Sequence, residues 1–163
     1  MPDFEALIGK GKYREAAKLL DAELAKKESD RLYYLRAIVS FRLKNYEYAH
    51  EMLEHALYMK KDPDYLKLKA LILMETLEFA EALEMLKGVL DQRKDAESYF
   101  LSSMCLMFLD DPKSREYLQL AYLADPGKTK ALIREFYGQF FRNNRYVSEK
   151  EKKALEARIA AIK

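Results

Sequence analysis

The sequence is poor in the residues on which several classes of protein depend. It has one cysteine, Cys105, so it cannot form an internal disulfide and does not imply an oxidising compartment. It has five glycines and four prolines in 163 residues, too few for the many turns of a β-sandwich. Its two histidines, His50 and His55, are five residues apart and do not share a helix face as an i, i+4 zinc pair would. We therefore expect no metal site.

Long apolar runs and an excess charge of one sign are also missing. No apolar stretch approaches the ~20 residues of a membrane-spanning helix, and residues 1–5 do not resemble a signal peptide. The formal net charge is +2, and no run of Lys and Arg is free of interleaved acidic and apolar residues. With 50% hydrophobic and 34% charged residues, the composition is that of a folded protein. We expect a cytoplasmic protein that neither inserts into membranes nor binds nucleic acid.

The arrangements that usually carry catalysis are absent from the sequence. No His, Cys or Ser stands in a nucleophile pattern, and Gly9-Lys10-Gly11 is too short for a phosphate-binding loop. Cys105 lies within an apolar segment, where a small buried side chain is the simpler interpretation. We expect no enzyme activity and no cofactor.

What the sequence does contain is an internal repeat of 33 residues, the signature of a repeat architecture. An aromatic residue followed three positions later by alanine begins at Tyr13, Tyr46 and Phe79. Other positions keep the same step, among them Leu20, Leu53 and Leu86; Tyr33, Leu66 and Tyr99; Leu35, Leu68 and Leu101; and Ala37, Ala70 and Ser103. A fourth copy continues one residue short, with Leu118 in the place of Leu86.

Each repeat reads as two helices joined by a short turn. The second helix carries a one-sided apolar stripe, as in Ala49, Met52, Leu53, Ala56 and Leu57. The first helix, as in residues 33–43 and 66–74, is apolar nearly all round and must be covered on several sides. Asp62-Pro63, Asp111-Pro112 and Asp125-Pro126 each predict a helix start, with an N-cap oxygen before a proline. Connections this short predict antiparallel helix pairs.

These features resemble the tetratricopeptide repeat (TPR). The resemblance rests on the aromatic residue with its alanine, the small residue of the first helix (Ala37, Ala70, Ser103) and the Asp-Pro pair. It implies an all-α fold, a right-handed superhelix (solenoid) of about four TPR-like helix pairs plus a C-terminal capping pair, in one domain of residues 1–163. The units would be about 3–30, 31–63, 64–96 and 97–128, the first with a truncated opening helix, and the last helices would fall in 129–163. The sequence departs from the pattern at Arg36, Lys69 and Ser102, where the family has leucine.

The last part of the chain predicts a terminal helix pair. One helix would span residues 129–142 with Phe136 and Phe140 among its apolar residues, a turn would fall at 143–145, and Ser148-Glu-Lys-Glu151 would be a capping box. These helices could stack on the array or fold back across its groove, where Phe136, Phe140 and Ile159 would fill it. The sequence leaves both arrangements open.

The resemblance also implies a function, because first helices line the concave face of such arrays. We expect a protein-interaction module, an adaptor or chaperone-like protein, that binds a peptide or helix of a partner in this groove. The expected lining residues are Arg31, Tyr34, Ile38, Phe41, Arg42, Lys67, Leu71, Met74, Phe100, Met104 and Met107. Alternatively these side chains are core, or the apolar strip serves self-association as a homodimer. A clamp for a C-terminal carboxylate, known in the family, is not expected, since these helices carry no Asn.

Overall fold

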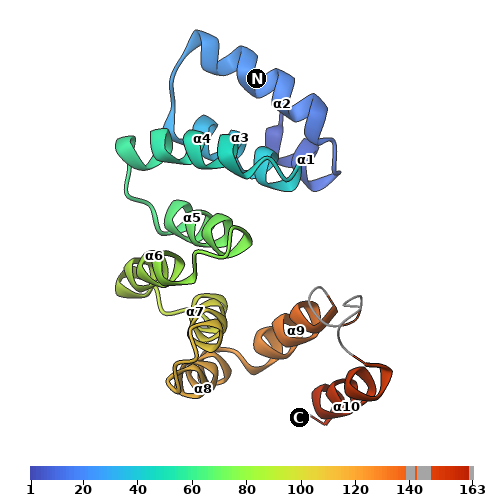
Figure 1. The fold of residues 1–163 in the computed structure, drawn as a ribbon. Coiled ribbons are helices and arrows are strands. Elements are labelled where there is room, and N and C mark those ends of the chain that lie inside the picture. The colour runs from blue at the N-terminus through green and yellow to red at the C-terminus, as the bar shows by residue number, and fades with distance from the viewer. Residues whose placement is uncertain (139–141, 143–147, 162–163) are drawn as a thin grey trace. The chain divides into compact units, whose positions relative to one another are not determined.

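The computed structural model describes residues 1–138, 142 and 148–161, without the side chains of Leu155 and Ile159. The described residues form ten helices and no strand, which confirms the all-α class. The helices are α1 (Phe4–Gly9), α2 (Tyr13–Lys26), α3 (Asp30–Arg42), α4 (Tyr46–Met59), α5 (Pro63–Glu75), α6 (Phe79–Gln92), α7 (Ala96–Phe108), α8 (Ser114–Ala124), α9 (Pro126–Tyr137) and α10 (Glu149–Ala160) (Figure 1). The predicted turn at 143–145, Phe140 and the side chain of Ile159 lie outside the described residues.

The chain divides into two compact units, Met1–Arg93 and Lys94–Lys163. In the first unit, α1 packs with α2, α3 with α4 and α5 with α6, and α2 and α4 each also contact the first helix of the following pair. In the second unit, α7 packs with α8, and α9 contacts both of them. The predicted succession of helix pairs is confirmed, while their membership of a single domain stays a prediction.

Helix starts follow the predicted capping at two of the three Asp-Pro pairs. The Asp62 carboxylate accepts a hydrogen bond from the Asp64 amide at 2.9 Å, and Asp125 accepts one from the Lys128 amide at 3.0 Å. At Asp111-Pro112 the helix start was predicted two residues too early, since α8 begins at Ser114. The Asp111 carboxylate still accepts a hydrogen bond from the Lys113 amide at 2.9 Å, as the Asp62 carboxylate does from the Asp64 amide. The Asp111 amide donates to the Leu106 carbonyl at 2.9 Å, so this residue still belongs to the turn that ends α7.

The turns inside the first four helix pairs share one backbone conformation. Gly11, Lys44, Leu77 and Asp110 all have positive φ, between 55° and 73°, and they are spaced at the 33-residue step. Around Lys44, its own amide donates to the Phe41 carbonyl and the Asn45 amide donates to the Ser40 carbonyl, at 3.0 and 2.9 Å. This is the Schellman pattern, which satisfies the free carbonyls at the end of a helix. Of the four positions, only the first has the glycine that this conformation favours.

The left-handed turn predicts the effect of a substitution at Leu77. Leu77→Gly should raise the free energy of unfolding by about 0.5–1 kcal/mol, since the left-handed conformation costs other residues roughly 1–2 kcal/mol and glycine's extra entropy offsets part of that gain. Leu77 is 72% exposed, so little burial is lost. Urea unfolding measures the change. Gly11→Ala is the reciprocal control, and it should lower the free energy of unfolding. An unchanged or lower stability of Leu77→Gly would contradict the assignment.

Small residues lie where the helices of a pair cross. Ala37, Ala70, Ala49 and Ala82 have no exposed surface. In the fourth pair Ser103 takes this position, and its hydroxyl donates to the backbone carbonyl of Ser114 at 2.8 Å. The predicted close approach of the two helices is therefore seen directly in a side chain that reaches the backbone of the partner helix.

The polar residues at the family's leucine position have local partners. The Arg36 guanidinium donates to the Asp21 carboxylate of α2 at 2.7 Å and lies 4.7 Å from the centre of the Tyr48 ring. One repeat later, Lys69 of α5 pairs with Glu54 of α4. Both pairs join the second helix of one pair to the first helix of the next. The hydroxyl of Ser102 instead donates to the Ser98 carbonyl within α7, at 2.8 Å.

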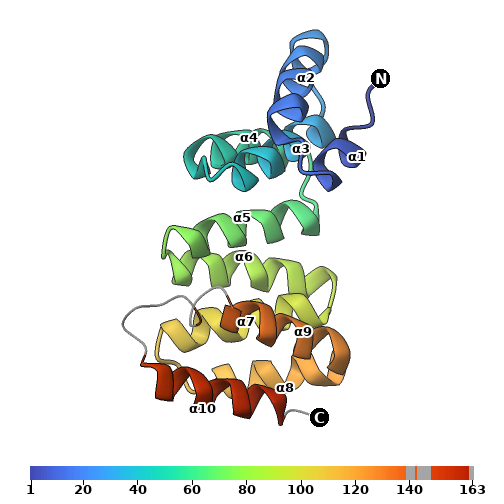
Figure 2. The same ribbon diagram turned by 90° about the vertical axis from the view of Figure 1, so that its right-hand side faces the viewer.

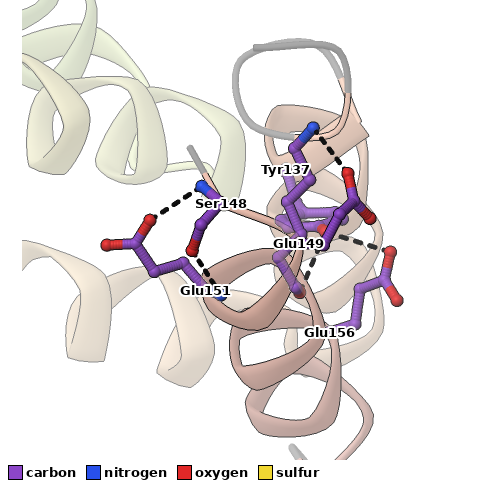
Figure 3. A network of polar contacts seen from close by, with 6 residues as sticks. Tyr137, Ser148, Glu149, Glu151 and Glu156 are labelled. Carbon is purple, nitrogen blue, oxygen red and sulfur yellow. Dashed lines mark hydrogen bonds and ion pairs between the residues drawn. The ribbon is translucent and has the colours of Figure 1, made fainter. Parts of the chain in front are cut away.

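Helix α10 is held to α9 by a tyrosine hydroxyl (Figure 3). Tyr137, 4% exposed, has its hydroxyl 3.1 Å from the Lys152 carbonyl and 3.0 Å from a carboxylate oxygen of Glu156. The predicted capping box is confirmed, because the Glu151 amide donates to Ser148 Oγ and the Ser148 amide donates to the Glu151 carboxylate. The backbone hydrogen bond from Ser148 lowers the pKa of Glu151.

This contact predicts that Tyr137→Phe loosens α10. Loss of the hydroxyl removes the hydrogen bonds to Lys152 and Glu156, so amide hydrogen exchange within 149–160 should become faster while exchange in α7 stays unchanged. Tyr58→Phe, at a tyrosine that is 94% exposed, is the matched control. Unchanged exchange in α10 would show that the hydroxyl does not hold the helix.

Candidate functional site

The lining residues predicted on α3 lie on one half-buried face. Tyr34, Ile38 and Phe41 are partly buried, and Arg31 and Arg42 are exposed at the two ends of the row. The Tyr34 ring lies 4.6 Å from the ring of Tyr65 on α5, and the Arg31 guanidinium lies over Tyr34 at 5.4 Å from the ring centre. Burial raises the pKa of the Tyr34 hydroxyl above its ordinary value.

The matching residues of α5 continue this face. Lys67, Leu71 and Met74 are partly buried on α5, which contacts α3 directly (Figure 2). Asp64 and Glu75 are exposed near the two ends of the helix. The Tyr46 hydroxyl lies 3.4 Å from the Glu75 carboxylate, and the Arg93 guanidinium lies 2.8 Å from the Asp64 carboxylate. We call Tyr34, Ile38, Phe41, Leu71 and Met74 the α3–α5 face: an apolar strip between charged ends.

In the second unit the predicted lining is largely covered. Phe100 and Met104 are 3% and 8% exposed, so neither is available to a partner on the surface. The Phe136 ring of α9 meets the rings of Phe100 and Phe108 edge to face, at 6.3 and 6.4 Å between centres. Met107 is 42% exposed and stays accessible. Helix α9 contacts both α7 and α8, and its Phe136 packs against Phe100, one of the residues assigned to partner contact.

Tyr65 is a member of this region that the sequence did not single out. It is 3% exposed, and its hydroxyl donates to the Asp30 carboxylate at the start of α3, at 2.7 Å. Burial, together with this hydrogen bond, raises its pKa well above the ordinary value. The signal was present in the repeat, because Tyr65 stands one step after the buried Leu32.

The histidines and the cysteine are placed in ordinary structural surroundings. His55 stacks on Tyr33 with 4.8 Å between ring centres, and His50 Nδ1 lies 3.7 Å from Glu54. In the part of the chain that the structure describes, no cluster of three or more His, Cys, Asp or Glu could hold a metal ion. No helix among the described residues is both long enough and apolar enough to cross a bilayer.

Cys105 is buried without exposed surface, and burial raises its pKa to about 12. The nucleophilic form of the group is the thiolate, so the native thiol should react with an aromatic disulfide reagent at pH 8 at least ~100-fold more slowly than free cysteine. The same chain in guanidinium chloride should react at the rate of free cysteine, which serves as the control. Fast labelling of the native protein would contradict the buried placement.

Comparison with known proteins shows what fold this is. No family model and no curated protein matches the chain. The solved structure of YrrB, described as "a TPR protein with an unusual peptide-binding site", superposes with a TM-score of 0.71 at 21% identity, over 82% of this chain and 71% of that chain. MamA from Desulfovibrio magneticus RS-1, from residue 41 to its end, gives a TM-score of 0.72 at 18% identity, over 98% and 88% of the two chains. The chain is therefore a TPR-like helical repeat protein with an all-α solenoid fold.

Proposed function

We propose that this chain is an adaptor or chaperone-like interaction module, which binds a peptide or helix of a partner protein on the α3–α5 face. The observation that carries the proposal is the row of half-buried aromatic, aliphatic and methionine side chains across two adjacent first helices. TPR-like neighbours support a protein-interaction module in general terms. YrrB, which shares the fold, is described by its peptide-binding site.

The chemistry of the face suits an amphipathic helix or an extended segment. Phe41 and Met74 present apolar side chains of large area, and the thioether of methionine adapts to differently shaped partners. The rings of Tyr34 and Tyr65 already pack against each other, so Tyr34 loses little conformational entropy when a partner covers it. Charges of both signs, Arg31 and Arg42 on α3 and Asp64 and Glu75 on α5, would set the orientation of the bound segment.

The proposed site is narrower than the sequence predicted. Phe100 and Met104 are left out because both are buried, Phe100 against Phe136 of α9, and Met107 is kept only as an accessible residue of the second unit. Absence of catalysis and a cytoplasmic location belong to the proposal as expectations. Homodimerisation through the same face is the alternative, and it would use the same residues.

The test is a peptide library displayed on phage and selected against the whole chain. Peptides enriched on the wild type should bind the double variant Phe41→Ser/Met74→Ser at least ~10-fold more weakly, because each truncated apolar anchor contributes roughly 1–2 kcal/mol. The matched control is Tyr58→Ser/Met59→Ser, which likewise removes one aromatic residue and one methionine, from positions that are 94% and 49% exposed on α4. Circular dichroism checks that all variants keep their helical content.

Two results would overturn the proposal. The first is enrichment of no peptide, and the second is equal binding to the wild type and the α3–α5 double variant. Light scattering before the selection separates the alternative, since a dimer that dissociates in the double variant but not in the α4 control would assign the face to self-association.

A further inference from the structure

Leu77 stands out among the turns that join the two helices of a pair. It is 72% exposed, and its φ is 65°. The equivalent turn positions hold Gly11, Lys44 and Asp110, which are glycine or charged residues. A leucine at positive φ is strained, and at this exposure its side chain gains little from burial in the folded chain. Strain that persists without such a gain points to a function for the side chain.

The residues around Leu77 are acidic. Glu75 and Glu78 are both exposed, and they give residues 75–78 a formal charge of −2. The Glu75 carboxylate lies 3.4 Å from the Tyr46 hydroxyl, and the Glu78 carboxylate accepts a hydrogen bond from the Thr76 hydroxyl at 2.7 Å. These partners are neutral, so both carboxylates keep their charge unbalanced. The turn therefore presents a leucine between two carboxylates.

The preceding turn of the same unit carries the opposite charge. Arg42 and Lys44 are exposed and give residues 42–45 a formal charge of +2, and Leu43 between them is 43% exposed. The two turns are neighbours, because the hydroxyl of Tyr46, the first residue of α4, reaches Glu75, the last residue of α5. We call residues 42–45 and 75–78 the turn edge: a basic turn with an exposed leucine beside an acidic turn with an exposed leucine.

An edge of this kind is complementary to itself. A two-fold axis that passes between the two turns places the basic turn of one copy opposite the acidic turn of another, and the reverse contact forms at the same time. Because the axis keeps first helices opposite first helices, Arg42 meets Glu75 and Lys44 meets Glu78. Opposite charges then face each other at both contacts. A second copy of the chain supplies both signs in the required order.

We propose that two copies of this chain associate through the turn edge, with Leu77 as the apolar anchor. Leu77 of one copy packs beside Leu43 of the other, and the charges of the two turns pair around them. Two turns form an interface smaller than the roughly 1,200 Å² of stable complexes, so the dimer is weak and dissociates as salt rises. The proposal does not depend on the function of the α3–α5 face. Arg42 and Glu75 also stand at the ends of that face, so the test variants leave both unchanged.

The first experiment removes the anchor. Sedimentation equilibrium of the wild type, from roughly 10 µM to 0.5 mM, should show a monomer–dimer equilibrium at low salt that shifts to monomer in roughly 0.5 M NaCl. Leu77→Gly should raise the dissociation constant at least ~10-fold, although it is expected to be the more stable chain. Loss of folding cannot then explain the loss of association. Leu123→Gly, at a leucine that is 82% exposed near the end of α8, is the matched control and should associate as the wild type does.

The second experiment exchanges the charges. In Lys44→Glu and in Glu78→Lys, each variant sets like charges against each other at both contacts of its own dimer, so each alone should associate at least ~10-fold more weakly. An equimolar mixture of the two variants restores opposite charges at these positions and should associate as the wild type does. Urea unfolding checks that both variants remain folded.

Three results would overturn the proposal. The first is a wild type that stays monomeric over the whole concentration range, and the second is equal association of Leu77→Gly and Leu123→Gly. The third is a mixture that associates no better than its separate variants. Phe41→Ser/Met74→Ser should dimerise as the wild type does, so failure of this proposal and failure of the function proposed for the α3–α5 face are distinguishable.

Discussion

The rest of the structure depends on the close crossing of the two helices in each pair. Ala37 and Ala70 on first helices, and Ala49 and Ala82 on second helices, are entirely buried. Where serine replaces alanine, the Ser103 hydroxyl reaches the backbone of α8. With small residues in this contact, the larger side chains of the first helices are free to pack on neighbouring pairs. This is how residues such as Tyr65 come to fill the space beside Tyr34.

The fold could be predicted because residues with the same structural role recur every 33 positions. The 33-residue step placed Ala37, Ala70 and Ser103 at equivalent crossings, and Asp62 and Asp125 marked helix starts that the structure confirms. At Asp111 the helix start was predicted two residues early, since α8 begins at Ser114 although the Asp111 carboxylate accepts a hydrogen bond from the Lys113 amide. The conformation of the turns was not foreseen, since Lys44, Leu77 and Asp110 give no sign of positive φ. Gly11, at the same step, was the available signal.

The candidate site could be predicted only where the exposure of its side chains depends on residues nearby in the sequence. The face on α3 and α5 lies where the repeat placed it, although partner binding there stays a proposal. Phe100 and Met104 fit the pattern equally well, yet both are buried, and Phe100 packs against Phe136 of α9, which comes much later in the chain. The periodicity of apolar residues predicts which face of a helix is buried, but it does not predict which residues pack on that face.

The ion pairs of Arg36 with Asp21 and of Lys69 with Glu54 have a consequence for how such a chain can change length. Each ion pair joins one helix pair to the next, and the Lys69–Glu54 ion pair stands one 33-residue step after the Arg36–Asp21 ion pair. A duplication of a 33-residue unit that carries Glu54 and Lys69 would therefore regenerate this junction with charges of matching sign, whereas one step further the equivalent positions, Lys87 and Ser102, do not bear opposite charges. A change of another length would bring residues other than these opposite charges to the junction. Electrostatic matching at these two junctions thus favours growth of the array by whole units.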